Sequence, residues 1–79
     1  MNIYRHTFTA TCPSDGENIV YRLEIRTTRM IMVEHLRTET ALIKKGYHEK
    51  IADALAEKFG GLQIMEAQHQ GIQIMTVRA

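Results

Sequence analysis

Apolar and polar residues alternate along two segments near the start of the chain. From Ile19 to Thr27 the alternation is clean, which is the period of a β-strand with one buried face. Ile3 to Thr11 is rich in threonine and aromatic residues, and residues 12–18 are dense in turn formers. The pattern therefore predicts a β-hairpin over residues 3–26 with its loop at residues 12–18.

Helical periodicity follows in the middle of the chain. Between Tyr47 and Phe59 apolar residues recur every three to four positions, and two glycines follow as natural helix terminators. The pattern of residues 30–45 is mixed, because its apolar residues fit both a continued strand and a helix. We expect a helix over residues 33–45, broken at Gly46, and the choice between strand and helix for residues 30–45 stays open.

Two further alternating segments, Leu62–Gln68 and Ile72–Arg78, are joined by three residues that include Gly71, which suits a second hairpin. The order of elements is strand, strand, helix, helix, strand, strand. Because both hairpins are antiparallel, the economical arrangement is an α+β two-layer fold with a four-stranded antiparallel sheet and both helices on one face. The sequence predicts a single domain over residues 1–79.

The alternation also predicts which residues of the sheet face the helices. The odd residues of the second strand should do so, together with Leu62, Ile64, Ile72 and Ile74. The opposite face should carry a mixture of apolar and charged residues, namely Val20, Arg22, Glu24, Arg26, Gln63, Met65, Ala67, Gln73, Met75 and Val77. A half-apolar face and two free sheet edges favour partner subunits.

Composition limits the classes of partner. The chain has 79 residues, so its core is thin and a deep ligand pocket needs a second subunit, which predicts a homo-oligomer. Ten Lys and Arg against nine Asp and Glu give a net charge of +1, which supplies no field to attract nucleic acid or an anionic membrane. Glutamates interleave with Arg22, Arg26 and Arg29, so we expect a solvated surface there and no nucleic-acid partner.

The expected location is the cytoplasm. No apolar run approaches the roughly 20 residues of a membrane span, and Arg5 and His6 lie where a signal peptide needs apolar residues. The single cysteine, Cys12, has no partner for an intramolecular disulfide, which agrees with a reducing compartment. We therefore expect no membrane partner.

Two residues of the first predicted loop are candidates for catalysis. Cys12 lies beside Pro13 rather than inside an apolar run, and a partly exposed thiol near a strand end suits a nucleophile; an unreactive small residue is the alternative. Asp15 is close enough in sequence to donate a proton to such a reaction, or it caps the backbone of its own turn.

His48 and Glu49 open the second predicted helix and are candidates for substrate binding. The helix dipole favours a carboxylate there without any function. A helix N-terminus also points donors toward a polar ligand, and a glutamate can accept two N–H groups from a guanine-like or pterin-like ring. The four histidines and the cysteine raise the question of zinc, but no pair has the spacing of a zinc motif, so no metal site is predicted.

Four short segments carry a resemblance to a known family: Phe8–Gly16, Val33–Glu34, Tyr47–Ala52 and Gly71–Ile74. In order and approximate spacing they resemble a shortened QueF-type nitrile reductase, the 7-cyano-7-deazaguanine reductase of queuosine biosynthesis. The resemblance covers most of the chain. That family belongs to the tunnelling-fold (T-fold) superfamily, whose unit of two strands, two helices and two strands assembles around a barrel with purine or pterin sites between subunits.

The resemblance implies roles for individual residues. It makes Cys12 the nucleophile that adds to a nitrile, with Glu49 and His48 holding the base. The proton-donating Asp of the family lies further from its cysteine, so Asp15 is a substitute for it. The lysine-rich nicotinamide-binding motif has no counterpart, because residues 34–39 offer one arginine alone. NADPH is therefore implied only if reductase activity is retained, and no other cofactor is predicted.

Together these features predict a small protein that binds a purine-like or pterin-like heterocycle at a subunit interface. A degenerate or partial nitrile reductase is the catalytic form of this hypothesis. The alternative, from another class, is a non-enzymatic interaction module, such as a phage or accessory protein, that docks through a sheet edge or the back face of the sheet.

Overall fold

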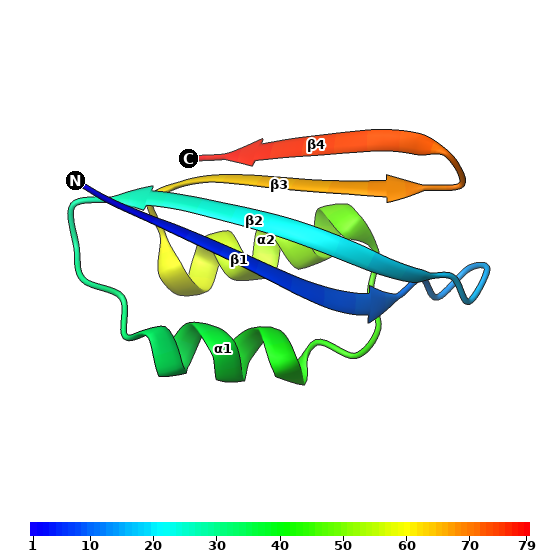
Figure 1. Cartoon of the computed structure of the whole chain (residues 1–79), viewed down its shortest axis with the longest axis horizontal. Helices are drawn as coiled ribbons and strands as arrows, with labels where there is room; N and C mark the ends of the chain where they lie inside the picture. Colours follow the sequence, from blue (N-terminus) through cyan, green and yellow to red (C-terminus); the bar gives the residue numbers. More distant parts are fainter.

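Two antiparallel hairpins form one four-stranded sheet in the computed structural model, which describes residues 1–79 (Figure 1). The strands are β1 (Asn2–Thr11), β2 (Asn18–Thr27), β3 (Leu62–His69) and β4 (Ile72–Arg78), and they lie in the order β1-β2-β3-β4. The helices α1 (Val33–Leu42) and α2 (His48–Phe59) cover one face of this sheet. The predicted α+β fold, with its ββααββ order, is confirmed.

The segment of mixed periodicity, residues 30–45, forms a helix and no strand. Helix α1 ends at Leu42 rather than at the expected residue 45, because the residues that follow bond to the end of β1. The Thr11 N–H donates to the Lys44 carbonyl at 3.0 Å, and the Gly46 N–H donates to the Thr11 carbonyl at 3.1 Å. These two bonds hold the start of α2 at the end of β1.

The core lies between the sheet and the helices, and β2 and α2 build most of it. The alternation predicted for β2 is confirmed, since its buried apolar residues are Ile19, Tyr21, Leu23 and Ile25. Helix α2 buries Ile51, Ala52, Leu55 and Phe59. Helix α1 is packed more loosely, because it buries only Leu36 and Thr40.

The face predicted for β3 is wrong by one residue. Leu62 and Ile64 were expected to face the helices, but both are only partly buried and lie on the opposite face. Met65 and Ala67, expected on that opposite face, are buried at 1% exposure each. The register agrees, because Met65 pairs with Leu23 of the helix-facing set.

Gln63 explains this error. It is polar, yet it is buried beneath α2 at 3% exposure. Its side-chain Nε2 donates to the Leu55 carbonyl at 3.0 Å and to the Gly60 carbonyl at 2.8 Å, which satisfies the C-terminal end of the helix from inside the core. In β4 the prediction holds for Ile74, which pairs with Ala67 and shares its face, whereas Ile72, also expected to face the helices, is 66% exposed beside the β3–β4 turn.

The open face of the sheet carries both ion pairs and exposed apolar side chains. Arg5 Nε and Arg26 Nε bond to the two carboxylate oxygens of Glu24 at 2.9 and 2.6 Å, and these partners lower the pKa of Glu24. Exposed apolar residues on this face are Ile3, Val20, Met75 and Val77. Neither helix has the length and apolar composition needed to cross a lipid bilayer.

Candidate functional site

One end of the sheet collects the residues that the sequence singled out. The β1–β2 loop, the β3–β4 turn and the first turn of α2 all lie at this end (Figure 1). The arrangement follows from topology, because β1 and β3 run in the same direction and so finish at the same end of the sheet. Cys12 and Asp15 are thereby brought together with His69, which comes from the end of β3, whereas the His48 side chain contacts Met65 and Thr76.

Asp15 lies at the centre of this cluster. Its Oδ2 accepts hydrogen bonds from His69 Nε2 at 2.8 Å and from Gln70 Nε2 at 2.6 Å, while its Oδ1 accepts the Glu17 backbone N–H at 2.9 Å. The Glu17 N–H, followed by Gln70 and His69, holds the pKa of the Asp15 carboxyl well below its ordinary value of 3.8. Asp15 is therefore an anionic acceptor at neutral pH, and the bond to Glu17 is the turn cap that the sequence offered as its alternative role.

Cys12 is buried at 3% exposure, so the partial exposure expected from the sequence is wrong. Its backbone closes the loop: the Cys12 N–H donates to the Glu17 carbonyl at 2.8 Å, and the Cys12 carbonyl accepts the Gly16 N–H at 2.9 Å. Gly16 has φ of 77°, a left-handed conformation that allows this tight closure. The loop thus folds over the thiol instead of presenting it to solvent.

The thiol is surrounded by other polar groups. The Cys12 Sγ, an Asp15 carboxylate oxygen and a His69 ring nitrogen all lie within 4.8 Å of one another. Tyr21 is completely buried, and its hydroxyl has no hydrogen-bond partner. Tyr21 and Cys12 belong to the same buried cluster, and burial raises the pKa of Tyr21.

His48 and Glu49 are neighbours in sequence that lie in different environments. His48 points inward, where its Nε2 donates to the Met65 carbonyl at 3.2 Å and lies 3.1 Å from Thr76 Oγ1. Its ring meets that of Tyr21 edge to face, with centroids 5.3 Å apart. Burial lowers the pKa of His48, so the imidazole is neutral at pH 7.

Glu49 lies in the first turn of α2 with its side chain exposed. Successive residues of a helix point about 100° apart, so an inward residue at the first position leaves the next one at the surface. The carboxylate is at the positive end of the helix dipole, where an anion is stabilised. Glu49 and Asp15 are therefore the two candidate residues at the surface, and of these Glu49 is the one at the start of a helix.

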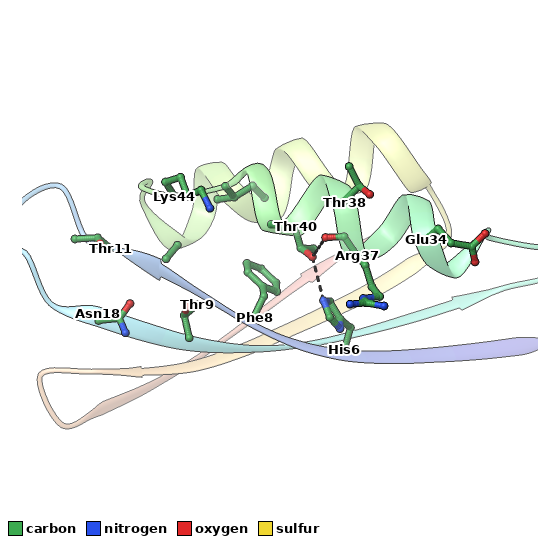
Figure 2. A pocket seen from close by; sticks show the side chains of 13 residues that line it. His6, Phe8, Thr9, Thr11, Asn18, Glu34, Arg37, Thr38, Thr40 and Lys44 are labelled. Carbon is green, nitrogen blue, oxygen red and sulfur yellow. Dashed lines mark hydrogen bonds between the residues drawn. The ribbon is translucent and has the colours of Figure 1, made fainter.

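A separate hollow of about 650 Å³ lies between α1 and β1 (Figure 2). His6 of β1 points across it, and its Nε2 lies 3.0 Å from Thr40 Oγ1. The Thr40 hydroxyl donates to the Leu36 carbonyl at 2.9 Å, so it accepts from His6. None of the residues proposed from the sequence for catalysis or binding lines this hollow.

The sequence missed Tyr21, His69 and Gln70 as members of the cluster at the end of the sheet. No spacing rule connects residue 69 with residue 12, and Tyr21 belonged simply to an apolar face. The topology could have indicated this cluster, because in a ββααββ sheet the turns after the first and third strands lie at the same end of the sheet. Comparisons of the chain with protein-family models, with curated proteins and with solved structures find no match.

Proposed function

We propose that this chain is a subunit of a T-fold-like homo-oligomer that binds a planar purine-like or pterin-like heterocycle at the seam between subunits. The observation that carries the proposal is the exposed Glu49 carboxylate at the positive end of α2, beside the polar end of the sheet. A carboxylate held there can accept the paired N–H groups on the edge of such a ring.

The sheet edges support assembly. β1 and β4 form the two edges of the sheet, and each leaves backbone N–H and C=O groups without a strand partner on its outer side. The exception is Thr11 at the end of β1, whose N–H and C=O bond to Lys44 and Gly46. Pairing β4 of one copy with β1 of the next would extend the antiparallel sheet toward a closed barrel. The open face would then line the inside of that barrel, and its exposed apolar residues would no longer contact water.

The heterocycle is bound without a covalent step in this proposal. The Cys12 thiol is buried, and its loop would have to open before a nitrile reached it. Reduction would also need a hydride donor, and Arg37 is the one basic residue in the segment that corresponds to the nicotinamide-binding motif. We therefore include no NADPH in the proposal, and we place the protein in the reducing cytoplasm, where an unpaired cysteine persists.

Calorimetric titration with 7-deazaguanine and pterin analogues tests the anchor. Wild type should bind, and Glu49→Gln should weaken binding about tenfold or more, because it removes a charge-assisted acceptor. Glu57→Gln is the matched control, since Glu57 is an exposed glutamate of the same helix and should be neutral on replacement. Equal affinity in wild type and Glu49→Gln contradicts the assignment of Glu49.

The interaction module is the competing function and uses the same free edges without a small ligand. A monomer that binds none of the analogues would favour it. Incubation with 7-cyano-7-deazaguanine tests the catalytic form, because thioimide formation joins the Cys12 sulfur to the nitrile carbon and adds the mass of the whole nitrile. An adduct in wild type and none in Cys12→Ala would establish the covalent step.

A further inference from the structure

We propose that Cys12, Asp15 and His69 form a binding site for a zinc-type divalent cation, distinct from the heterocycle site at Glu49. The three ligand atoms come from the end of β1, from the β1–β2 loop and from the end of β3, and they lie within 4.8 Å of one another. A cation bound there would cross-link the two hairpins at the end of the sheet where their turns meet (Figure 1).

The donor set suits zinc. Zinc accepts a thiolate, an imidazole nitrogen and a carboxylate oxygen, with bonds of about 2.0–2.3 Å that separate tetrahedral ligand atoms by about 3.3–3.6 Å. Asp15 Oδ2 and His69 Nε2 are 2.8 Å apart, so they must separate by about half an ångström to admit the cation. Both side chains are about a quarter exposed, at 28% and 25%, and have room for this movement.

A second observation is an unpartnered polar group in the same buried cluster as Cys12. Tyr21 is completely buried, and its hydroxyl lacks any hydrogen-bond partner, which is unfavourable for a buried donor. The thiol of Cys12 belongs to the same buried cluster as this phenol and is a weak acceptor, whereas a metal-bound thiolate is an anion and a strong one. Zinc binding releases the thiol proton and thereby gives the Tyr21 hydroxyl its acceptor.

Glu17 supplies the fourth position. Its Oε1 lies 3.6 Å from His69 Nε2, on the side of the loop that already holds Asp15. Rotation of this partly exposed side chain completes a set of four protein ligands, as in structural zinc sites.

The proposals of a zinc site and of a heterocycle site can be contradicted independently, because Glu49 is not one of the zinc ligands. A zinc-bound thiolate is also not free to attack a nitrile, so zinc binding and a thioimide adduct at Cys12 exclude each other. No metal spacing was recognisable in the sequence, because Cys12, Asp15 and Glu17 belong to the first hairpin and His69 to the second.

Zinc titration of the full chain, after removal of metal with EDTA, tests the site. Wild type should bind one Zn²⁺ per chain with a rise in Tm, and Co²⁺ in its place should show the thiolate-to-cobalt charge-transfer absorption. Cys12→Ser and His69→Gln should each weaken Zn²⁺ binding about a hundredfold or more, and Cys12→Ser should abolish the charge-transfer band. His35→Gln, which changes an exposed histidine of α1, should bind as wild type does.

Two results would overturn the site. The first is that wild type neither binds Zn²⁺ nor shows a higher Tm in its presence. This result does not depend on the folding of any variant. The other is Zn²⁺ binding of wild-type strength in folded Cys12→Ser, which would place the cation elsewhere.

Discussion

Asp15 and His69 lie 54 residues apart in the chain, yet Asp15 Oδ2 accepts a hydrogen bond of 2.8 Å from His69 Nε2. This contact joins the β1–β2 loop to the end of β3, at the end of the sheet where both hairpins turn. It also holds in place the loop that covers the Cys12 thiol. At this end of the protein Asp15 thus links the two hairpins, through this bond and through the one from Gln70.

Asp15→Asn should loosen this end of the sheet in metal-free buffer. The amide removes the negative charge and presents its own N–H groups to the donors of His69 and Gln70, while the turn cap to Glu17 survives. We expect faster amide hydrogen exchange in residues 12–17 and 69–71. Asp53→Asn, which breaks the surface pair with Arg78, is the control and should leave these amides unchanged. Unchanged exchange in Asp15→Asn would show that the contact does not order the loop.

Gln63→Leu should destabilise the fold although it places an apolar residue in the core. The substitution leaves the Leu55 and Gly60 carbonyls without their buried donor, so we expect a loss of about 2 kcal/mol in the free energy of unfolding. Urea denaturation measures it. The exposed Gln68→Leu serves as the matched control and should change stability by less than about 0.5 kcal/mol. A stabilised Gln63→Leu would mean that the amide contributes nothing to the end of α2.

His48 should make the protein less stable as the pH falls below its ordinary pKa of 6.5. Burial lowers the pKa of His48 in the folded state, so the unfolded chain takes up the proton first and acidification favours unfolding. Nearby Glu49 opposes this lowering and Arg78 adds to it. His48→Gln retains a donor for the Met65 carbonyl but does not titrate.

Urea denaturation of both proteins between pH 8 and pH 5 checks this effect. Their stability curves should run parallel from pH 8 to pH 7 and separate below about pH 6.5, where only wild type loses the His48 contribution. Parallel curves down to pH 5 would exclude a buried neutral imidazole. Asp15 titrates below its ordinary pKa of 3.8 and so does not enter this range.

Gly61→Ala should be more harmful than Gly71→Ala. Both glycines have positive φ, at 74° and 80°, so alanine is strained at either position. At Gly61 an added Cβ would also lie 2.7 Å from the Arg26 carbonyl oxygen, whereas at Gly71 it meets no atom within 4 Å. We expect losses of about 2 kcal/mol or more at Gly61 and about 1 kcal/mol at Gly71 by urea denaturation. Equal losses would mean that the backbone near Arg26 adjusts freely.

The sequence predicted the fold because its strongest signals are local. The alternation in β2 and the helical period of α2 each reflect one buried face, and both agree with the structure. The prediction for the face of β3 was wrong because Gln63 is buried and forms hydrogen bonds in the core. The spacing of apolar residues does not indicate a buried polar residue. Helix α1 ends early through backbone bonds between Thr11 and residues 44–46, which no side-chain pattern records.

The candidate site was predictable only in part. Cys12, Asp15 and His48 do lie at one end of the sheet, but their surroundings depend on contacts between residues far apart in the chain. Adjacent residues such as His48 and Glu49 have the same helix-start signal, and packing alone turns one inward and the other outward. The burial of Cys12 likewise follows from the closed β1–β2 loop and from the hydrogen bond between His69 and Asp15 that holds this loop.

Native mass spectrometry of wild type, titrated with 7-deazaguanine and pterin analogues, tests the central claim most directly. If the site is formed between subunits, the ligand should appear only on oligomers, at no more than one molecule per subunit interface, and Glu49→Gln should need about tenfold more ligand or greater for the same occupancy. Ligand bound to free monomers, or oligomers that take up none of the analogues, would contradict a heterocycle site between subunits.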